Sequence, residues 1–391
     1  VGRSGVWDPH ELDRADLARR IAVQLFGATE LGVEAGRDLM PTLGDLGMGE
    51  LPFTSMALGL SALGLHDYAG RLPLALWAVA GALLLYVLLS RLVSPRAGLY
   101  GVVVLCTMPL YFMQARTMLG DIVTIVAHLA CFGGLLGAML DVGASSSVVR
   151  RSAVTGAWLL VALVGAVAGY LSRGAIIGVA APALGVGLCW LCVTGAGLSV
   201  SISQGRRAFH GVGVAALVVG GGALWLGVDA LLEVGFGDKS VLRVLGVALV
   251  SKPPPEATFE LTIRDLGHAL FPWSAFLPFA IGRLLGHGTP EAGDRGARNT
   301  VVRVALLVGA AAAYGAFALL APYTGAIAFS APGVLAAVAA LVMVDFERGA
   351  SPSPVVAGGT VLLAVVLWRD LVKIPVKALS AYGVSERTLP K

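Results

Sequence analysis

Charged residues are scarce in this sequence. Only 13% of its 391 residues are Asp, Glu, Lys or Arg, about half the usual share in a soluble domain. This scarcity excludes an ordinary soluble enzyme, a disordered chain and a nucleic-acid binder, because too few charges remain to solvate a surface or to neutralise phosphates. The net charge of +4 therefore reports on membrane topology rather than on an acidic partner.

Cysteine and histidine are also few. The four cysteines lie inside apolar runs, where we expect small packing residues; they are Cys106, Cys131, Cys189 and Cys192. No two of the six histidines have the spacing of metal ligands, so we predict neither a catalytic metal nor a cofactor. The sequence also lacks a Walker loop, a dinucleotide fingerprint and a nucleophile elbow.

Apolar residues are abundant, at 57% of the chain with a mean hydropathy of +0.83. A bilayer core about 30 Å thick needs about 20 apolar residues of helix. Runs of this kind occupy residues 72–91, 97–114, 118–140, 153–171, 174–197, 210–232, 266–284, 302–321, 325–344 and 354–374. They predict an all-α polytopic membrane protein whose bundle of about ten transmembrane helices covers residues 72–374.

Arginines gather in alternate loops between these runs. They are Arg91 and Arg96, Arg150 and Arg151, Arg206 and Arg207, Arg283, Arg295, Arg298 and Arg303, and Arg348. The positive-inside rule places these loops in the cytoplasm. Residues 1–71, the loop 233–265 and the tail 375–391 then face outward. Because an outward segment must be carried across, we expect a further span ahead of Val1.

The first outward segment opens with a cluster of charges. Asp8 can cap a helix that starts at Pro9, and Glu11 and Arg14 follow at spacings of three, on the same helix face. This pattern has two interpretations. The charges are solvated on an amphipathic surface helix, or the two carboxylates act as a general base at the membrane surface.

Three more ionisable residues stand out at the expected spans. Asp121 lies at the outer end of one span, where an acid is either functional or opposes the helix dipole. Arg173 lies alone on the outer side, where it can reach lipid head groups or bind a phosphate. His128 lies in the middle of a span, and we expect it to be a hydrogen-bonded core residue.

Six short motifs occur in the order known from one family. They are Trp7–Glu11 with Ala15–Arg19; Glu50–Phe53 with Leu63–Leu65 and Ala69–Leu76; Ala115–Thr117 with Asp121; Ser172–Gly174; Leu270–Ser274; and Ala321–Tyr323 with Pro332. In this order the chain resembles the GT-C integral-membrane glycosyltransferases, in the branch of the protein O-mannosyltransferases and the lipid A aminoarabinose transferases. The resemblance covers nearly the whole chain.

The resemblance implies a GT-C bundle with surface helices in the first outer loop. It also implies an inverting transfer of a sugar from a polyprenyl-phosphate donor to a protein, lipid or glycan acceptor, on the periplasmic face of a bacterial inner membrane. Membrane lipids are the other expected partners. By this resemblance an acid of the first loop deprotonates the acceptor, and basic residues hold the lipid phosphate.

The chain departs from the family pattern at two positions. His10 stands where the family has the first of two acids, so the base is Asp8, Glu11 or the imidazole of His10 itself, with Asp121 in support. Leu51 stands where the family has a lysine. The residues that the resemblance offers for binding the donor phosphate and the substrate are Arg14, Glu50, Arg116, Arg173, Lys252 and Tyr323.

Two other functions remain open from the sequence. A transporter or flippase of lipid-linked sugars would use the same cavity without breaking a bond. A catalytically silent relative that scaffolds other membrane proteins is suggested by His10 and Leu51.

Overall fold

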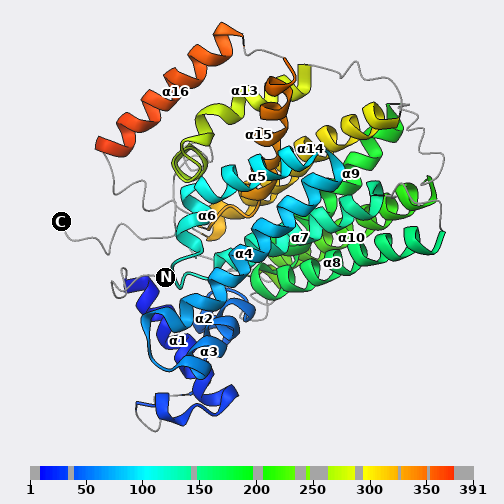
Figure 1. Cartoon of the computed structure of the whole chain (residues 1–391). Coiled ribbons are helices and arrows are strands. Elements are labelled where there is room, and N and C mark those ends of the chain that lie inside the picture. The colour runs from blue at the N-terminus through cyan, green and yellow to red at the C-terminus, as the bar shows by residue number, and fades with distance from the viewer. Residues whose placement is uncertain are drawn as a thin grey trace.

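The computed structural model describes residues 9–33, 39–141, 148–196, 206–233, 244–246, 263–286, 294–324, 327–349 and 353–373. Its regular elements are helices (Figure 1). They are α1 (Pro9–Phe26), η1 (Thr29–Leu31), α2 (Leu43–Leu46), α3 (Leu51–Leu63), α4 (Asp67–Leu92), α5 (Pro95–Thr107), α6 (Pro109–Gln114), α7 (Asp121–Leu140), α8 (Val148–Ala175), η2 (Ile176–Ala180), α9 (Ala181–Gly195), α10 (Arg206–Glu233), η3 (Ile263–His268), α13 (Trp273–Gly286), α14 (Asp294–Thr324), α15 (Pro332–Glu347) and α16 (Pro354–Lys373).

Each predicted span contains a helix of this bundle. Six segments are long and apolar enough to cross a bilayer, namely Asp67–Leu92, Asp121–Leu140, Val149–Gly195, Arg207–Leu232, Gly296–Leu320 and Pro354–Lys373. The third of these is 47 residues long and holds two predicted spans. The other predicted spans lie on shorter helices, α5 with α6, α13 and α15.

The chain reverses direction within the longest segment, between α8 and η2. Arg173 and Gly174 have non-helical backbone angles there. Gly174 has a φ of +65°, which a residue with a Cβ rarely adopts, and a Cβ would also collide with the backbone of residues 244–246. The turn therefore needs glycine at this position.

The predicted span 97–114 is interrupted near its middle. The helix α5 ends at Thr107, and α6 begins at Pro109. Met108 between them has a ψ of 122°, because the ring of a following proline disfavours the helical conformation. The prediction of one continuous helix was wrong at this point. A smaller difference is that α4 begins at Asp67 instead of residue 72.

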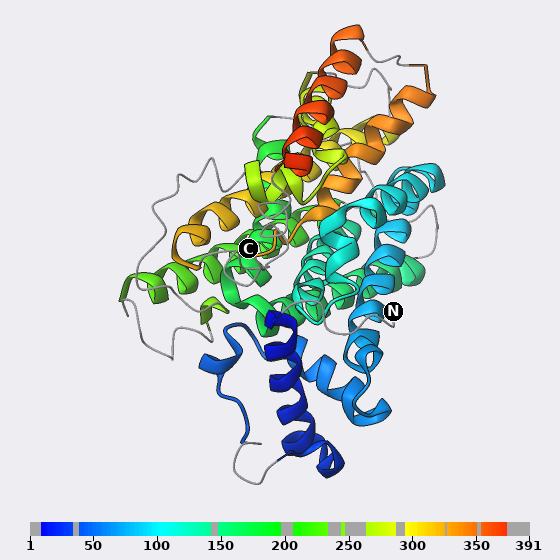
Figure 2. The same cartoon turned by 90° about the vertical axis from the view of Figure 1, so that its left-hand side faces the viewer.

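The helices differ strongly in how deeply they are packed. In α7, 89% of the apolar window is buried within the protein, against 6% in α16. Buried residues also run without interruption from Pro332 to Val342 in α15. The helices α7 and α15 are thus deeply packed, and α16 lies at the edge of the bundle (Figures 1 and 2).

The structure confirms the expectation for His128 and only part of the expectation for the cysteines. His128 is fully buried, with Nδ1 3.3 Å from the hydroxyl of Ser330, which confirms the core histidine. Among the cysteines, Cys131 and Cys189 are buried, whereas Cys106 and Cys192 are exposed on the outside of their helices. The packing prediction was therefore wrong for Cys106 and Cys192.

Helices α7 and α8 touch through their backbones. A Cβ on Gly134 of α7 would meet the backbone of Ala162, and a Cβ on Gly165 of α8 would meet the backbone of Cys131. In a membrane, such close approach between small residues replaces the hydrophobic effect as the main attraction between helices.

We expect Gly165→Ala to lower the free energy of unfolding by about 1–3 kcal/mol, because backbone atoms cannot move aside as a side chain can. Gly156 of the same helix meets nothing within 4 Å, so Gly156→Ala should be neutral or slightly stabilising. Thermal unfolding of both variants in detergent checks this. Equal midpoints would contradict the close packing of α7 on α8.

One end of the bundle is tied together by charged residues from the arginine-rich loops, and we call it the far end. Asp141 lies 3.9 Å from Arg91 and accepts a hydrogen bond from Trp158. Glu347 pairs with Arg96 and with the hydroxyl of Tyr100. These contacts link α4, α7 and α8 in one group and α5 and α15 in another, and they bring the ends of three arginine-rich loops to the same end of the bundle.

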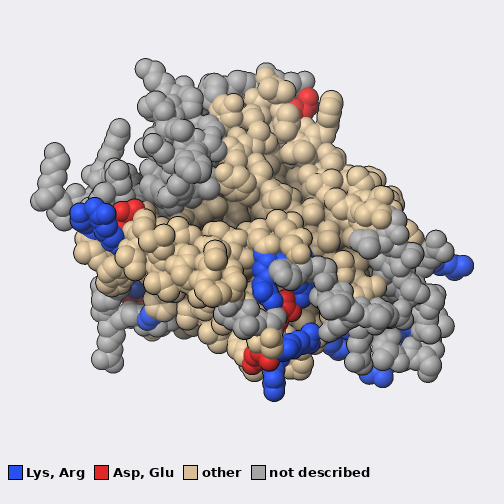
Figure 3. Space-filling view, turned by 90° about the horizontal axis from the view of Figure 1, so that it is seen from above, with Lys and Arg blue, Asp and Glu red and all other residues tan. Residues whose placement is uncertain are grey.

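The helices α1–α3 lie at the opposite end, which we call the α1 end. Figures 1 and 2 show them projecting beyond the bundle. Large apolar residues on the described outer faces, such as Leu160 and Leu163 of α8, are exposed. Figure 3 shows that charged side chains gather in a few groups and leave most of the described surface on that face uncharged. This surface suits an integral membrane protein.

Candidate functional site

Helix α1 supplies the first wall of the site. Proline has its φ preset for the first helical turn and lacks the N–H that would be left unbonded there, so the helix begins at Pro9 as predicted. The inner face of α1 buries Leu17, Ala18, Ile21 and Ala22. This apolar stripe has helical spacing, and the helix packs against α3.

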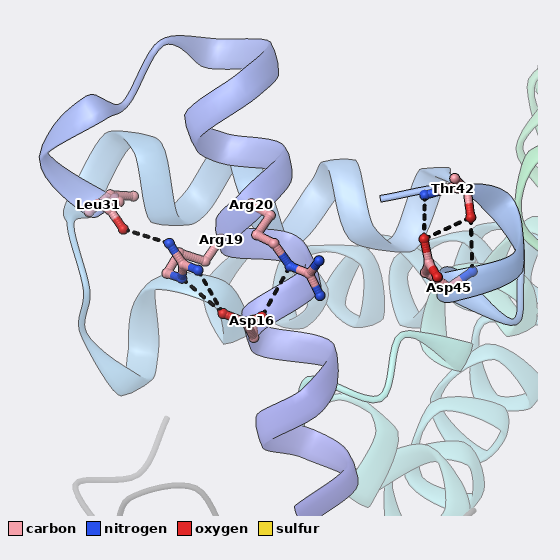
Figure 4. Close-up of polar contacts among 6 residues, drawn as sticks. All are labelled: Asp16, Arg19, Arg20, Leu31, Thr42 and Asp45. Carbon is pink, nitrogen blue, oxygen red and sulfur yellow. Dashed lines mark hydrogen bonds and ion pairs between the residues drawn. The ribbon is translucent and has the colours of Figure 1, made fainter. Parts of the chain in front are cut away.

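The outer face of α1 is held by a set of ion pairs (Figure 4). The carboxylate of Asp16 accepts hydrogen bonds from Arg19 at 2.8 Å and 3.0 Å and lies 3.1 Å from Arg20. Arg19 also donates to the carbonyl of Leu31, at 2.9 Å. Thus Arg19 joins α1 to η1.

A capping box starts the short helix α2 (Figure 4). The carboxylate of Asp45 accepts from the backbone N–H and the hydroxyl of Thr42, at 2.8 Å and 2.7 Å. The two partners satisfy each other's otherwise unpaired groups. This cap fixes the entry of the chain into the turn before α3.

Glu11 lies at the centre of the α1 end. Its carboxylate accepts two hydrogen bonds from Arg71 of α4, at 2.9 Å and 3.0 Å, and a third from the backbone N–H of Met118, at 2.9 Å. The side chains of Glu11 and Arg71 are 1% and 3% exposed. The interpretation of Glu11 as a solvated surface charge was therefore wrong, because its carboxylate connects α1 to α4 and to the turn before α7.

Asp121 and Arg173 form a second buried ion pair. Asp121 is the first residue of α7, and Arg173 lies at the turn between α8 and η2. The guanidinium donates through Nε, at 2.9 Å, and through Nη2 to one carboxylate oxygen of Asp121, and both side chains are 7% exposed. The sequence singled out both residues separately, and the structure brings them together.

The two ion pairs flank one short piece of chain. Met118, which binds Glu11, and Asp121, which binds Arg173, are three residues apart, so their Cα atoms lie within about 11 Å. The turn before α3 packs beside Arg173, because the N–H of Gly49 donates to the carbonyl of Ser172 at 3.0 Å. The α1 end thus holds two buried ion pairs, each formed by a carboxylate and an arginine.

The other predicted residues are less closely gathered. Glu50 directly follows Gly49 and is exposed, and Arg14 is half-buried on α1. Arg116 is exposed, with its guanidinium 4.7 Å from the centre of the Phe112 ring. Tyr323 is half-buried near the end of α14, at the predicted outer boundary. Asp8, Lys252 and the side chain of His10 lie outside the described residues.

Sequence reasoning missed Arg71 as a site residue. A signal was present, since Arg71 is a basic residue at the edge of an apolar run and lies in one of the motifs shared with the family. The backbone N–H of Met118 could not be found in this way, because a backbone donor carries no sequence signature.

The fold is that of a known enzyme. The crystal structure of ArnT from Cupriavidus metallidurans in the apo state superposes with a TM-score of 0.62 over 98% of this chain. The chain has the ArnT fold. A second structure of ArnT from the same organism, bound to undecaprenyl phosphate, matches 95% of the chain with a TM-score of 0.60. The sequence identity to ArnT is 17% in both cases.

The similarity to ArnT confirms the predicted all-α polytopic bundle. This chain spans about three fifths of the length of those structures, 63% and 61%. No protein-family model and no curated protein matches the sequence. In the part of the chain that the structure describes, no group of three or more His, Cys, Asp or Glu side chains could hold a metal ion.

Proposed function

We propose that this chain is a membrane glycosyltransferase that moves a sugar from a polyprenyl-phosphate donor to an acceptor at the α1 end of the bundle. One observation carries the proposal: in a bundle with the ArnT fold, two carboxylate–arginine ion pairs are buried together at the α1 end. The ArnT structure bound to undecaprenyl phosphate supports a donor lipid of that type.

The proposed reaction is a single displacement that inverts the anomeric carbon. The acceptor oxygen forms a bond to that carbon while the bond from the carbon to the phosphate oxygen breaks. A general base takes the acceptor proton, and the electron pair of the broken bond leaves with the polyprenyl phosphate. Negative charge therefore grows on the phosphate, where a positioned cation has its largest effect.

The geometry divides these roles among the residues. The carboxylate of Glu11 is occupied by Arg71 and Met118, so we assign it to positioning α1. The base is then Asp8 or His10, at the start of the same helix. Arg173 is the cation for the departing phosphate, held in place by Asp121, and Arg116 is a second contact from the exposed surface.

The face of the membrane follows from the charge pattern. The far end carries the arginine-rich loops, which the positive-inside rule keeps in the cytoplasm. We accordingly place the α1 end on the periplasmic side of a bacterial inner membrane. A polyprenyl-linked sugar presented on that side reaches the site without a soluble nucleotide donor.

The decisive experiment is native mass spectrometry of the purified protein with added undecaprenyl phosphate. We expect the wild type to retain the lipid. Arg116→Ala should weaken retention by about three- to tenfold, the loss of one exposed phosphate contact. Arg96→Ala is the matched control, because Arg96 is an exposed arginine at the far end.

Two results would count against the donor assignment. One is that the wild type binds undecaprenyl phosphate no better than bulk phospholipid. The other is that Arg96→Ala weakens retention as much as Arg116→Ala. The assignment of the acids fails separately if transfer of the lipid-linked sugar survives in all of Asp8→Asn, Glu11→Gln and Asp121→Asn.

One observation favours the second candidate, a catalytically silent relative. Leu51, where the family pattern has lysine, begins α3 and packs against the apolar core, so it offers no charge to a phosphate. Retention of undecaprenyl phosphate without any sugar transfer would favour this candidate. Transfer of a sugar would exclude it.

A further inference from the structure

A pair of buried hydroxyl groups lies next to the ion pair of Asp121 with Arg173, and none of the roles proposed above uses it. The hydroxyl of Thr124 on α7 donates to the hydroxyl of Ser172 on α8, at 3.2 Å. The two residues are 2% and 0% exposed. Burying a hydroxyl has a cost that its hydrogen bond only offsets, whereas valine and alanine would fill the same space without polar atoms. Packing alone therefore does not require this pair.

The hydroxyl pair and the ion pair join the same two helices side by side. Asp121 and Thr124 are three residues apart on α7, so they lie on one face of that helix. Ser172 and Arg173 are consecutive residues at the end of α8. Each of the two α7 residues thus bonds to one of the two α8 residues.

Ser172 is the point at which the chain leaves α8. The next residue, Arg173, already has non-helical backbone angles, with a φ of −140° and a ψ of 28°. The hydroxyl of Ser172 accepts from Thr124 and donates to the carbonyl of Gly169, at 3.1 Å. Its carbonyl accepts from the N–H of Gly49, at 3.0 Å. The backbone ahead of Arg173 is therefore tied to α7, to α8 and to the turn before α3.

The guanidinium of Arg173 is anchored along one edge. Its Nε and Nη2 both donate to the same carboxylate oxygen of Asp121, and its Nη1 makes no hydrogen bond to the described part of the chain. An arginine presents its donors as a rigid planar fork. The direction of Nη1 is therefore set by the position of Asp121 and by the backbone that Ser172 holds.

We propose that Ser172 and Thr124 are positioning residues for Arg173. Their hydroxyl bond holds the end of α8 on α7, so that Nη1 of Arg173 faces the phosphate of the polyprenyl-phosphate donor. Neither hydroxyl contacts the phosphate itself. The inference rests on the proposed glycosyltransferase function and adds two residues to its phosphate site.

The first measurement is hydrogen exchange at Nε of Arg173, by NMR of the full chain in lipid nanodiscs. The signal is identified by its loss in Arg173→Gln, and the bond to Asp121 protects its proton. Ser172→Ala and Thr124→Val each remove the hydroxyl bond with little change in size. We expect each to raise the exchange rate about three- to tenfold, the effect of one lost hydrogen bond. Thr124→Ser keeps a hydroxyl and should exchange within about twofold of the wild type.

Two controls separate positioning from a general loss of stability. The Nε–H of Arg71, which donates to Glu11 at 2.9 Å, is the internal control, because global loosening would raise its exchange as well. Ser330→Ala is the matched control variant. Ser330 is also a buried serine, and its hydroxyl lies 3.3 Å from Nδ1 of His128 on α7. We expect Ser330→Ala to leave exchange at Arg173 unchanged.

Two exchange results overturn the proposal. One is that Ser172→Ala and Thr124→Val both exchange at Arg173 as the wild type does. The other is that exchange at Arg71 rises in these variants as much as exchange at Arg173, since the hydroxyl pair would then stabilise the bundle as a whole.

Binding of undecaprenyl phosphate is measured on the same proteins by native mass spectrometry. We expect Ser172→Ala and Thr124→Val to bind this lipid about three- to tenfold more weakly than the wild type. In an Arg173→Gln background Ser172→Ala should cause no further loss, because a positioning residue acts only through the residue that it positions. An equal loss in both backgrounds would contradict the proposal.

The two measurements distinguish this inference from the proposed function. Raised exchange at Arg173, in a chain that binds undecaprenyl phosphate no better than bulk phospholipid, would support the positioning by Ser172 and Thr124 and contradict the proposed function alone. Specific binding of undecaprenyl phosphate with unchanged exchange in both variants would contradict the positioning alone.

Discussion

Arg71→Ala is expected to lower the free energy of unfolding by about 3–5 kcal/mol. The substitution leaves the carboxylate of Glu11, which is 1% exposed, buried without the guanidinium of Arg71. A buried charge without its counter-ion is among the most destabilising defects in a protein. Thermal unfolding in detergent measures the effect as a lowered midpoint.

The double variant Glu11→Gln with Arg71→Met separates loss of the charge pair from loss of packing. It removes both charges and keeps side chains of similar length, so we expect it to recover most of the lost stability. The replacement of a buried ion pair by uncharged residues is often close to neutral. If Arg71→Ala and the double variant unfold together at the wild-type temperature, the buried pair does not hold α1 on the bundle.

Arg173→Gln is expected to reduce transfer of the lipid-linked sugar by about 100- to 1,000-fold, the usual cost of removing one donor to a developing negative charge. The reduction should fall on kcat more than on KM, because the charge on the departing phosphate grows only in the transition state. The measurement is the rate of sugar release from the polyprenyl-phosphate donor by purified protein in nanodiscs.

Arg303→Gln provides a matched control at the far end. Arg303 is 9% exposed and donates to both oxygens of Asp345, at 2.7 Å and 2.8 Å, so it too is a buried arginine that pairs neighbouring helices. We expect both variants to lose stability, and only Arg173→Gln to lose transfer. Equal losses of transfer would show that Arg173 acts on folding rather than on the phosphate.

These experiments distinguish a structural role, proposed for Glu11 and Arg71, from a role in sugar transfer, proposed for Arg173. The pair of Glu11 with Arg71 joins three segments, and its side chains are only 1% and 3% exposed. The pair of Asp121 with Arg173 lies at a turn that packs closely on the backbone of residues 244–246.

The sequence by itself indicated the fold class, and it predicts the membrane topology. Apolar runs of bilayer length and the alternation of arginine-rich loops are properties of the chain alone, and the lipid environment turns them directly into spans and ends. The start of α1 at Pro9 and the burial of His128 are equally local. Short motifs kept in order also indicated a fold that the superposition on ArnT confirms at 17% sequence identity.

Only the tertiary structure decided which charges meet. Glu11 and Arg71 are 60 residues apart, and Asp121 and Arg173 are 52 residues apart, so no periodicity or spacing links them. The packing of α7 on α8 through backbone contacts at glycine places Asp121 beside Arg173. The hydroxyl pair of Thr124 with Ser172 depends on the same packing, because the two residues lie on α7 and α8.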